Sequence, residues 1–96
     1  MSKTVESGVY LLGRAAAADI VVSSENTATS RIHAELRTDD QERLFVRDLG
    51  SRHGTFVNRV RISRVTILKP GDEISLAGQA NFRVEDLNAL IRQIHS

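Results

Sequence analysis

The sequence predicts an all-β fold, an antiparallel β-sandwich of short strands with one short C-terminal helix. Short apolar runs recur along the chain, and Ser, Asn, Asp or Gly residues that favour turns bound each of them. Val, Ile and Leu must fill the core, because the chain has only three Phe, one Tyr and no Trp. These residues suit β-strands. A length of 96 residues predicts a single domain.

About ten predicted strands follow one another at a spacing typical of a sandwich. Their apolar runs cover residues 9–12, 19–22, 33–37, 44–47, 55–57, 61–62, 65–67, 73–76 and 81–84. Residues 38–41 form a polar turn between two alternating runs, which indicates a hairpin. Pro70 and Gly71 occupy the central positions of a predicted type II turn, because that turn requires a positive φ at its third residue.

The two ends of the chain differ from this pattern. Residues 1–7 are polar and patternless, which indicates a loose tail, and residues 8–86 form the predicted sandwich domain. Residues 87–96 are predicted to form a helix after Asp86, a good N-cap. Leu87, Leu90, Ile91 and Ile94 recur there at helical spacing. We expect this helix to dock on the sandwich edge; the alternative is that it begins a linker or a partner-binding segment.

Composition excludes several classes of function. The net charge is +1, from 13 basic and 12 acidic residues. The overall electrostatic field of the protein is therefore weak, and we expect it to cause no binding to nucleic acid or membrane. The chain has no Cys, which excludes disulfides and thiol catalysis and suits the cytoplasm. No apolar run has the length of a signal peptide or a membrane span. We expect a monomer without cofactor or metal.

Three polar clusters interrupt the strand pattern in predicted loops. They are Gly13-Arg14, residues 29–33, and residues 48–55 with Asn58 just after. Loops of a sandwich gather at its two ends, so these clusters are candidates for one shared site. A phosphate group requires charge-assisted donors, hydroxyl donors and backbone N–H groups that can approach closely. Arg14, Ser30, Arg31 and Arg52 supply the first two. Taken singly, each residue also has an ordinary structural interpretation, as a surface arginine or a turn residue.

Taken together, the order and spacing of these residues resemble the forkhead-associated (FHA) domain. The matching segments are Gly13-Arg14, Ser30-Arg31-x-His33 and Asp48-Leu49-x-Ser51-x-x-Gly54-Thr55-x-x-Asn58. The resemblance covers about residues 8–86 and includes the turn at Pro70-Gly71-Asp72. It implies a sandwich of about eleven strands that binds phosphothreonine in a peptide, on a partner protein that is a target of a Ser/Thr kinase.

The resemblance also implies a role for each matching residue. Arg14 and Ser30 would hold the phosphate, with Arg31 beside it. Arg52, which the motif does not match, is a further candidate contact to the phosphate or the peptide. Ser51 and His53 lie where the peptide is held. The residues expected to support the site structurally are Gly13, His33, Gly54, Thr55 and Asn58.

The sequence departs from the family pattern at two positions. Family members often have Asn at the position of His53, where its amide holds the main chain of the ligand. A neutral imidazole offers one donor and one acceptor, so it can replace that amide in part. Protonation of His53 would add positive charge near the phosphate, which predicts tighter binding near pH 6 than near pH 8 after allowance for the phosphate itself. The second departure is Arg59, where a glycine is common in a turn.

Four alternative functions remain open from the residues alone. An FHA-fold scaffold that binds a partner without phosphate, through a sheet face or edge, is the main one. A hydrolase would need Ser30 or Ser51 with a histidine and Asp48, but the Gly-x-Ser-x-Gly motif is missing. Metal binding by His33, His53 and His95 lacks ligand spacing. Nucleic-acid binding by Arg59, Arg61 and Arg64 lacks aromatic stacking groups, and we expect Arg59 and Arg61 to lie on one solvated face.

Overall fold

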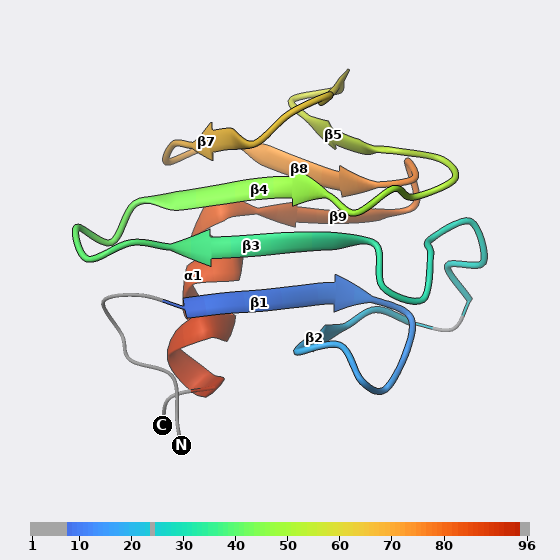
Figure 1. The fold of residues 1–96 in the computed structure, drawn as a ribbon, viewed down its shortest axis with the longest axis horizontal. Coiled ribbons are helices and arrows are strands. Elements are labelled where there is room, and N and C mark those ends of the chain that lie inside the picture. The colour runs from blue at the N-terminus through green and yellow to red at the C-terminus, as the bar shows by residue number, and fades with distance from the viewer. Residues whose placement is uncertain (1–7, 24, 95–96) are drawn as a thin grey trace.

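The chain folds into two facing β-sheets and one helix, in a computed structural model that describes residues 8–23 and 25–94 (Figure 1). The elements in these ranges are β1 (Gly8–Gly13), β2 (Ile20–Val21), β3 (Ala34–Thr38), β4 (Leu44–Asp48), β5 (Thr55–Val57), β6 (Val60–Arg61), β7 (Thr66–Leu68), β8 (Glu73–Leu76), β9 (Ala80–Arg83) and α1 (Val84–Ile94). The predicted tail at residues 1–7 lies outside the described residues.

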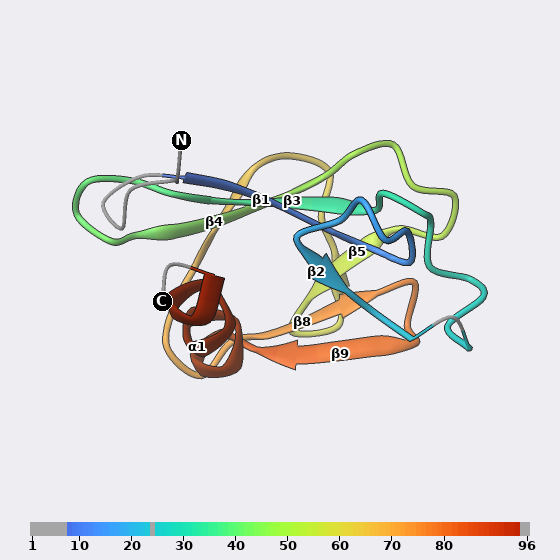
Figure 2. The ribbon, with the colours of Figure 1, turned by 90° about the horizontal axis from the view of Figure 1, so that it is seen from below.

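The β-sandwich is confirmed by the arrangement of the strands. One sheet has the order β2-β1-β3-β4-β7 and the other β6-β5-β8-β9, and Figure 2 shows them as two layers. All neighbouring strands are antiparallel except β1 and β2, which pair in parallel. The described ranges contain nine strands, fewer than the expected eleven, because segments such as residues 25–29 form consecutive turns instead of pairing.

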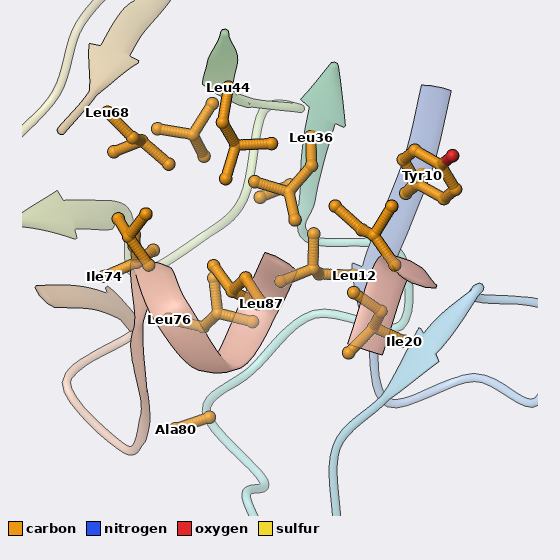
Figure 3. Packing of buried hydrophobic residues seen from close by; sticks show 14 of the residues in the cluster. Tyr10, Leu12, Ile20, Leu36, Leu44, Leu68, Ile74, Leu76, Ala80 and Leu87 are labelled. Atoms are coloured by element: carbon orange, nitrogen blue, oxygen red, sulfur yellow. The ribbon is translucent and has the colours of Figure 1, made fainter. Parts of the chain in front are cut away.

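The hydrophobic core lies between the two sheets. Side chains alternate along each strand, so that Tyr10 and Leu12 of β1 point inward and are fully buried, as expected for period-two alternation. Leu36 of β3 does the same from the first sheet, and Ile74 and Leu76 of β8 face it from the second. Figure 3 shows these residues packed around Leu87 of α1.

The C-terminal helix completes this core, which confirms the expected docking. Val84, Leu87 and Ile91 are buried and belong to the core cluster, and Leu90 packs partly against it. The helix begins at Val84, directly after β9, and not after Asp86 as predicted. Asp86 lies in the first turn, where a carboxylate interacts favourably with the helix dipole. Ile94 is exposed. The helix in the described ranges lacks the length and apolar character that crossing a bilayer requires.

Two tight turns have backbone geometry that bears on the sequence predictions. At the first, the Asp72 N–H donates to the Lys69 carbonyl over 3.0 Å, and Gly71 has a φ of 89°, as the predicted type II turn requires. At the second, Asn58 and Arg59 form a two-residue hairpin between β5 and β6 with φ values of 50° and 71°. This hairpin returns the chain toward the start of β5.

Candidate functional site

Three loops that are distant in sequence meet at one end of the sandwich, on the right in Figure 1. Backbone hydrogen bonds join the segment after β1 to the loop at residues 25–33, and join that loop to the segment after β4. The Arg14 N–H donates to the Ser30 carbonyl over 3.2 Å, and the Leu49 N–H donates to the His33 carbonyl over 3.0 Å. The three polar clusters found in the sequence therefore converge, apart from Asn58.

Arg14 and Ser30 are neighbours whose positions are fixed by the backbone. The Arg14 Nε donates a hydrogen bond of 2.8 Å to the Thr29 carbonyl, which orients the guanidinium. Thr29 is buried, and its hydroxyl donates to the Leu76 carbonyl over 3.4 Å. Within the described part of the chain, the terminal nitrogens of Arg14 and the Ser30 hydroxyl have no hydrogen-bond partner. These groups can act as donors to an anion.

Gly13 allows the end of β1 to approach the loop that carries Arg31. A Cβ at this position would overlap the Arg31 carbonyl oxygen and would lie 2.9 Å from the Cα of Ile32. The same Arg31 carbonyl accepts a hydrogen bond of 3.0 Å from the Ala15 N–H. A glycine is therefore needed here for close packing of two backbones.

His33 connects two of the loops through its ring. The ring is fully buried, and its Nδ1 accepts a hydrogen bond of 3.0 Å from the Ser30 N–H. Because Nδ1 is an acceptor, the ring proton lies on Nε2, which donates to the Gly54 carbonyl over 2.7 Å. Both ring nitrogens are thus engaged with backbone groups, so neither is available to take a proton from a serine hydroxyl. His33 therefore ties the Ser30 and Gly54 backbones together through its ring.

Asp48 organises the third loop through hydrogen bonds from Ser51 and Thr55. Its carboxylate accepts from the Ser51 N–H, the Ser51 hydroxyl and the Thr55 hydroxyl. The Ser51 hydroxyl in turn accepts from the Gly54 N–H over 2.9 Å. Burial acts to raise the pKa of Asp48, but the hydrogen bonds from Ser51 and Thr55 lower it below its usual value. Asp48 is therefore a structural carboxylate with its oxygens occupied.

The remaining predicted residues divide into an exposed group and one that lies elsewhere. Arg31, Arg52 and His53 are exposed at the convergent end, and Ser51 is partly buried beside them. Asn58 lies at the opposite end of β5. Its side-chain amide donates to Asp72 over 2.9 Å and accepts from the Glu73 N–H over 3.0 Å, so it supports the hairpin turn and does not contact the loops.

Two residues near the loops were not predicted as part of a site. Gln79 accepts a hydrogen bond of 2.8 Å from the Ala28 N–H, which ties the β8–β9 turn to the loop at residues 25–33. The side chain of Arg61 covers Gly54. Periodicity placed Arg61 on a solvated face, and the two-residue turn at residues 58–59 was the available signal that β6 returns toward Gly54.

Among the described residues, no group of three or more histidine or carboxylate side chains could hold a metal ion. The site at the convergent end instead combines arginines, hydroxyl groups and exposed loop backbone. Such a set favours an anion with several oxygen acceptors.

Comparisons with known proteins agree with this geometry. A family model described as the FHA domain matches residues 10–77. A comparison with curated protein sequences gave no significant match. Among solved structures, an FHA domain described in a study of phosphothreonine-dependent interactions is 32% identical, with a TM-score of 0.69, covering 78% of this chain and 74% of that one.

Two further solved structures have similar folds. The FHA domain of FhaA, complexed with the intracellular domain of Rv3910, is 32% identical over 79% of both chains, with a TM-score of 0.67. The N-terminal FHA domain of Rad53p from S. cerevisiae, in complex with a phosphothreonine peptide, is 19% identical, with a TM-score of 0.68 over 91% of this chain and 77% of that one. The chain belongs to the FHA domain family.

Proposed function

We propose that this protein is a phosphopeptide-binding module that recognises phosphothreonine on a partner protein, with Arg14 and Ser30 as the phosphate contacts. The observation that carries the proposal is the pairing of these two residues. Their backbones are hydrogen bonded, Arg14 is oriented through its Nε, and their remaining donors are unoccupied within the described residues. A phosphate dianion bound there would receive charge-assisted and hydroxyl hydrogen bonds together.

The exposed residues of the same end complete the proposed site. Arg31 and Arg52 would add positive charge beside the phosphate, and Ser51 and His53 would contact the main chain of the peptide. FHA domains are interaction modules, and relatives of this chain bind phosphothreonine peptides or partner domains. We therefore infer a non-enzymatic role in signalling or assembly, as a cytoplasmic monomer whose partner is phosphorylated by a Ser/Thr kinase.

A scaffold that uses the FHA fold without phosphate is the alternative. It requires that Arg14 and Ser30 bind no ligand. However, Gly13, His33 and Thr29 all position that pair through close packing or hydrogen bonds. Elaborate support for two otherwise unused donors favours a bound anion.

The experiment is a fluorescence-anisotropy titration with a degenerate phosphothreonine peptide pool, its phosphoserine counterpart and the unphosphorylated pool. Arg14→Ala and Ser30→Ala should each weaken binding of the phosphothreonine pool by about 1.5 to 3 kcal/mol, as expected for bonds to a charged group. The matched control is Arg83→Ala, because Arg83 is an exposed arginine at the end of β9 that adjoins α1.

Two results would overturn the proposal. Equal binding of phosphorylated and unphosphorylated pools would favour the scaffold. An equal loss of affinity in Arg83→Ala and Arg14→Ala would show that the effect comes from net charge and not from a site.

A further inference from the structure

Arg61 has a position that gives the convergent loops an additional cation. If Gly54 carried a Cβ, that atom would lie 2.5 Å from the Arg61 Nε and 2.9 Å from its Cζ. The guanidinium therefore lies directly over the backbone of Gly54. Gly54 follows His53 in the loop that the proposed function assigns to the peptide.

The strand pairing explains how β6 delivers Arg61 to this loop. Residues 58–59 turn the chain, Arg61 then pairs with Phe56, and the Ile62 N–H donates to the Thr55 carbonyl over 2.9 Å. Cross-strand partners share a face of the sheet, so Arg61 and Phe56 lie on the same side. Gly54 precedes Phe56 by two residues, which places its Cα diagonally beside Arg61 on that face.

The backbone of Gly54 separates Arg61 from the phosphate contacts. The Gly54 carbonyl accepts from the His33 Nε2 and from the Ala77 N–H, whereas its Cα is covered by Arg61. His33 also binds the N–H of Ser30. Arg61 thus lies next to the same loop but on the side of the four-stranded sheet.

The electrostatic surroundings leave this cation without an internal partner. Arg61 is exposed, and it has no hydrogen bond or ion pair to any residue in the ranges 8–23 and 25–94. Arg52 and His53 precede Gly54 in the same loop and are also exposed. The carboxylate of Asp48, at the end of β4 before this loop, already accepts hydrogen bonds from Ser51 and Thr55.

We propose that Arg61 forms a subsite for an acidic side chain of the bound peptide, close to the phosphothreonine. This inference rests on the proposed function and adds a preference for ligand sequence. An aspartate or glutamate at the flanking position would pair with the guanidinium over Gly54. The partner is therefore a phosphothreonine peptide with an acidic residue close to its phosphorylated side chain.

The test compares phosphothreonine peptides that carry Asp or Asn at each position on either side of the phosphothreonine. The intact protein should bind the Asp peptide more tightly than the Asn peptide at one flanking position, by about two- to five-fold, as expected for a partly exposed ion pair. The preference should decline with added salt, because exposed charges are screened.

Variants at Arg61 then assign the preference to this residue. Arg61→Gln should abolish it while Arg61→Lys retains part of it. Arg61→Glu should reverse the preference, so that a peptide with Lys at the flanking position binds more tightly than the peptide with Asp there. Arg59→Gln is the matched control, because Arg59 lies in the turn at the opposite end of β5, and it should leave the preference unchanged.

The outcomes separate this inference from the proposed function. If all peptides require the phosphate and Arg14, but the Asp preference is missing or persists in Arg61→Gln, the proposed function stands and the Arg61 subsite is wrong. If phosphorylation makes no difference to binding of any peptide, both are wrong. If the preference is present and only the Arg61 variants change it, both are supported.

Discussion

Replacing His33 with alanine should destabilise the fold and weaken ligand binding, although His33 is buried and does not face the ligand. The substitution removes hydrogen bonds to the Ser30 N–H and the Gly54 carbonyl. Each such bond contributes about 1 kcal/mol net. The fully buried ring also leaves a cavity, whose cost adds to the lost bonds.

The Gly54 carbonyl limits this cost, because it keeps its bond from the Ala77 N–H. The Ser30 N–H, in contrast, loses its acceptor. We therefore expect His33→Ala to lower the free energy of unfolding by about 2 to 4 kcal/mol. At temperatures where the variant is folded, phosphopeptide affinity should fall about two- to ten-fold, because Ser30 must be ordered on binding.

Urea unfolding followed by circular dichroism measures the first effect, and anisotropy titration measures the second. The matched control is His53→Ala, which removes an exposed histidine from the neighbouring loop. It should change stability by less than about 0.5 kcal/mol while still weakening peptide binding. Equal stability losses in the two variants, or a loss below about 1 kcal/mol in His33→Ala, would refute the reasoning about the buried ring.

Three other predictions follow from the fold. Leu87→Ala should lower the free energy of unfolding by about 2 to 5 kcal/mol, because Leu87 is fully buried. Ile94→Ala should lower it little, because that side chain is 41% exposed. Equal urea midpoints for the two variants would contradict the packing of α1. Arg59→Gly should stabilise the protein by about 0.5 to 1 kcal/mol in thermal unfolding, because its φ of 71° is unfavourable for any residue with a Cβ; a lower melting temperature would be the contrary result. The pKa of Asp48 is lowered in the folded protein, so its contribution to stability is present above the unfolded value of about 3.9 and is lost as the pH falls through the folded value. Asp48→Asn should therefore flatten the dependence of stability on pH below about 4, and parallel profiles for variant and parent would contradict the hydrogen-bond network.

Local sequence patterns carried enough information to predict the sandwich, because alternation is a strong signal where one strand face is buried. Tyr10 and Leu12, or Ile74 and Leu76, show it directly. The start of α1 was harder to predict from the sequence. Asp86 is a good N-cap by residue type, yet the chain enters the helix at Val84 because β9 leads into it without a loop, and because Val84 itself is buried in the core.

Part of the candidate site could be predicted, because Arg14 and Ser30 belong to a spaced pattern that the family resemblance identifies. The contact between Arg61 and Gly54 depends on the pairing register of β5 and β6, which a short exposed strand does not encode in its own residues. Asn58 matches the family pattern, but the sequence does not indicate that its contacts are with Asp72 and Glu73.

The central claim is that a phosphate binds between Arg14 and Ser30, and amide NMR spectra test it most directly. Titration with one phosphothreonine peptide should shift the backbone N–H signals of residues 14, 30–31 and 51–54 and the Nε–H signal of Arg14. The same peptide without phosphate should leave these signals in place at equal concentration. Shifts that appear equally with both peptides, or that map instead to β9 and α1, would contradict the account.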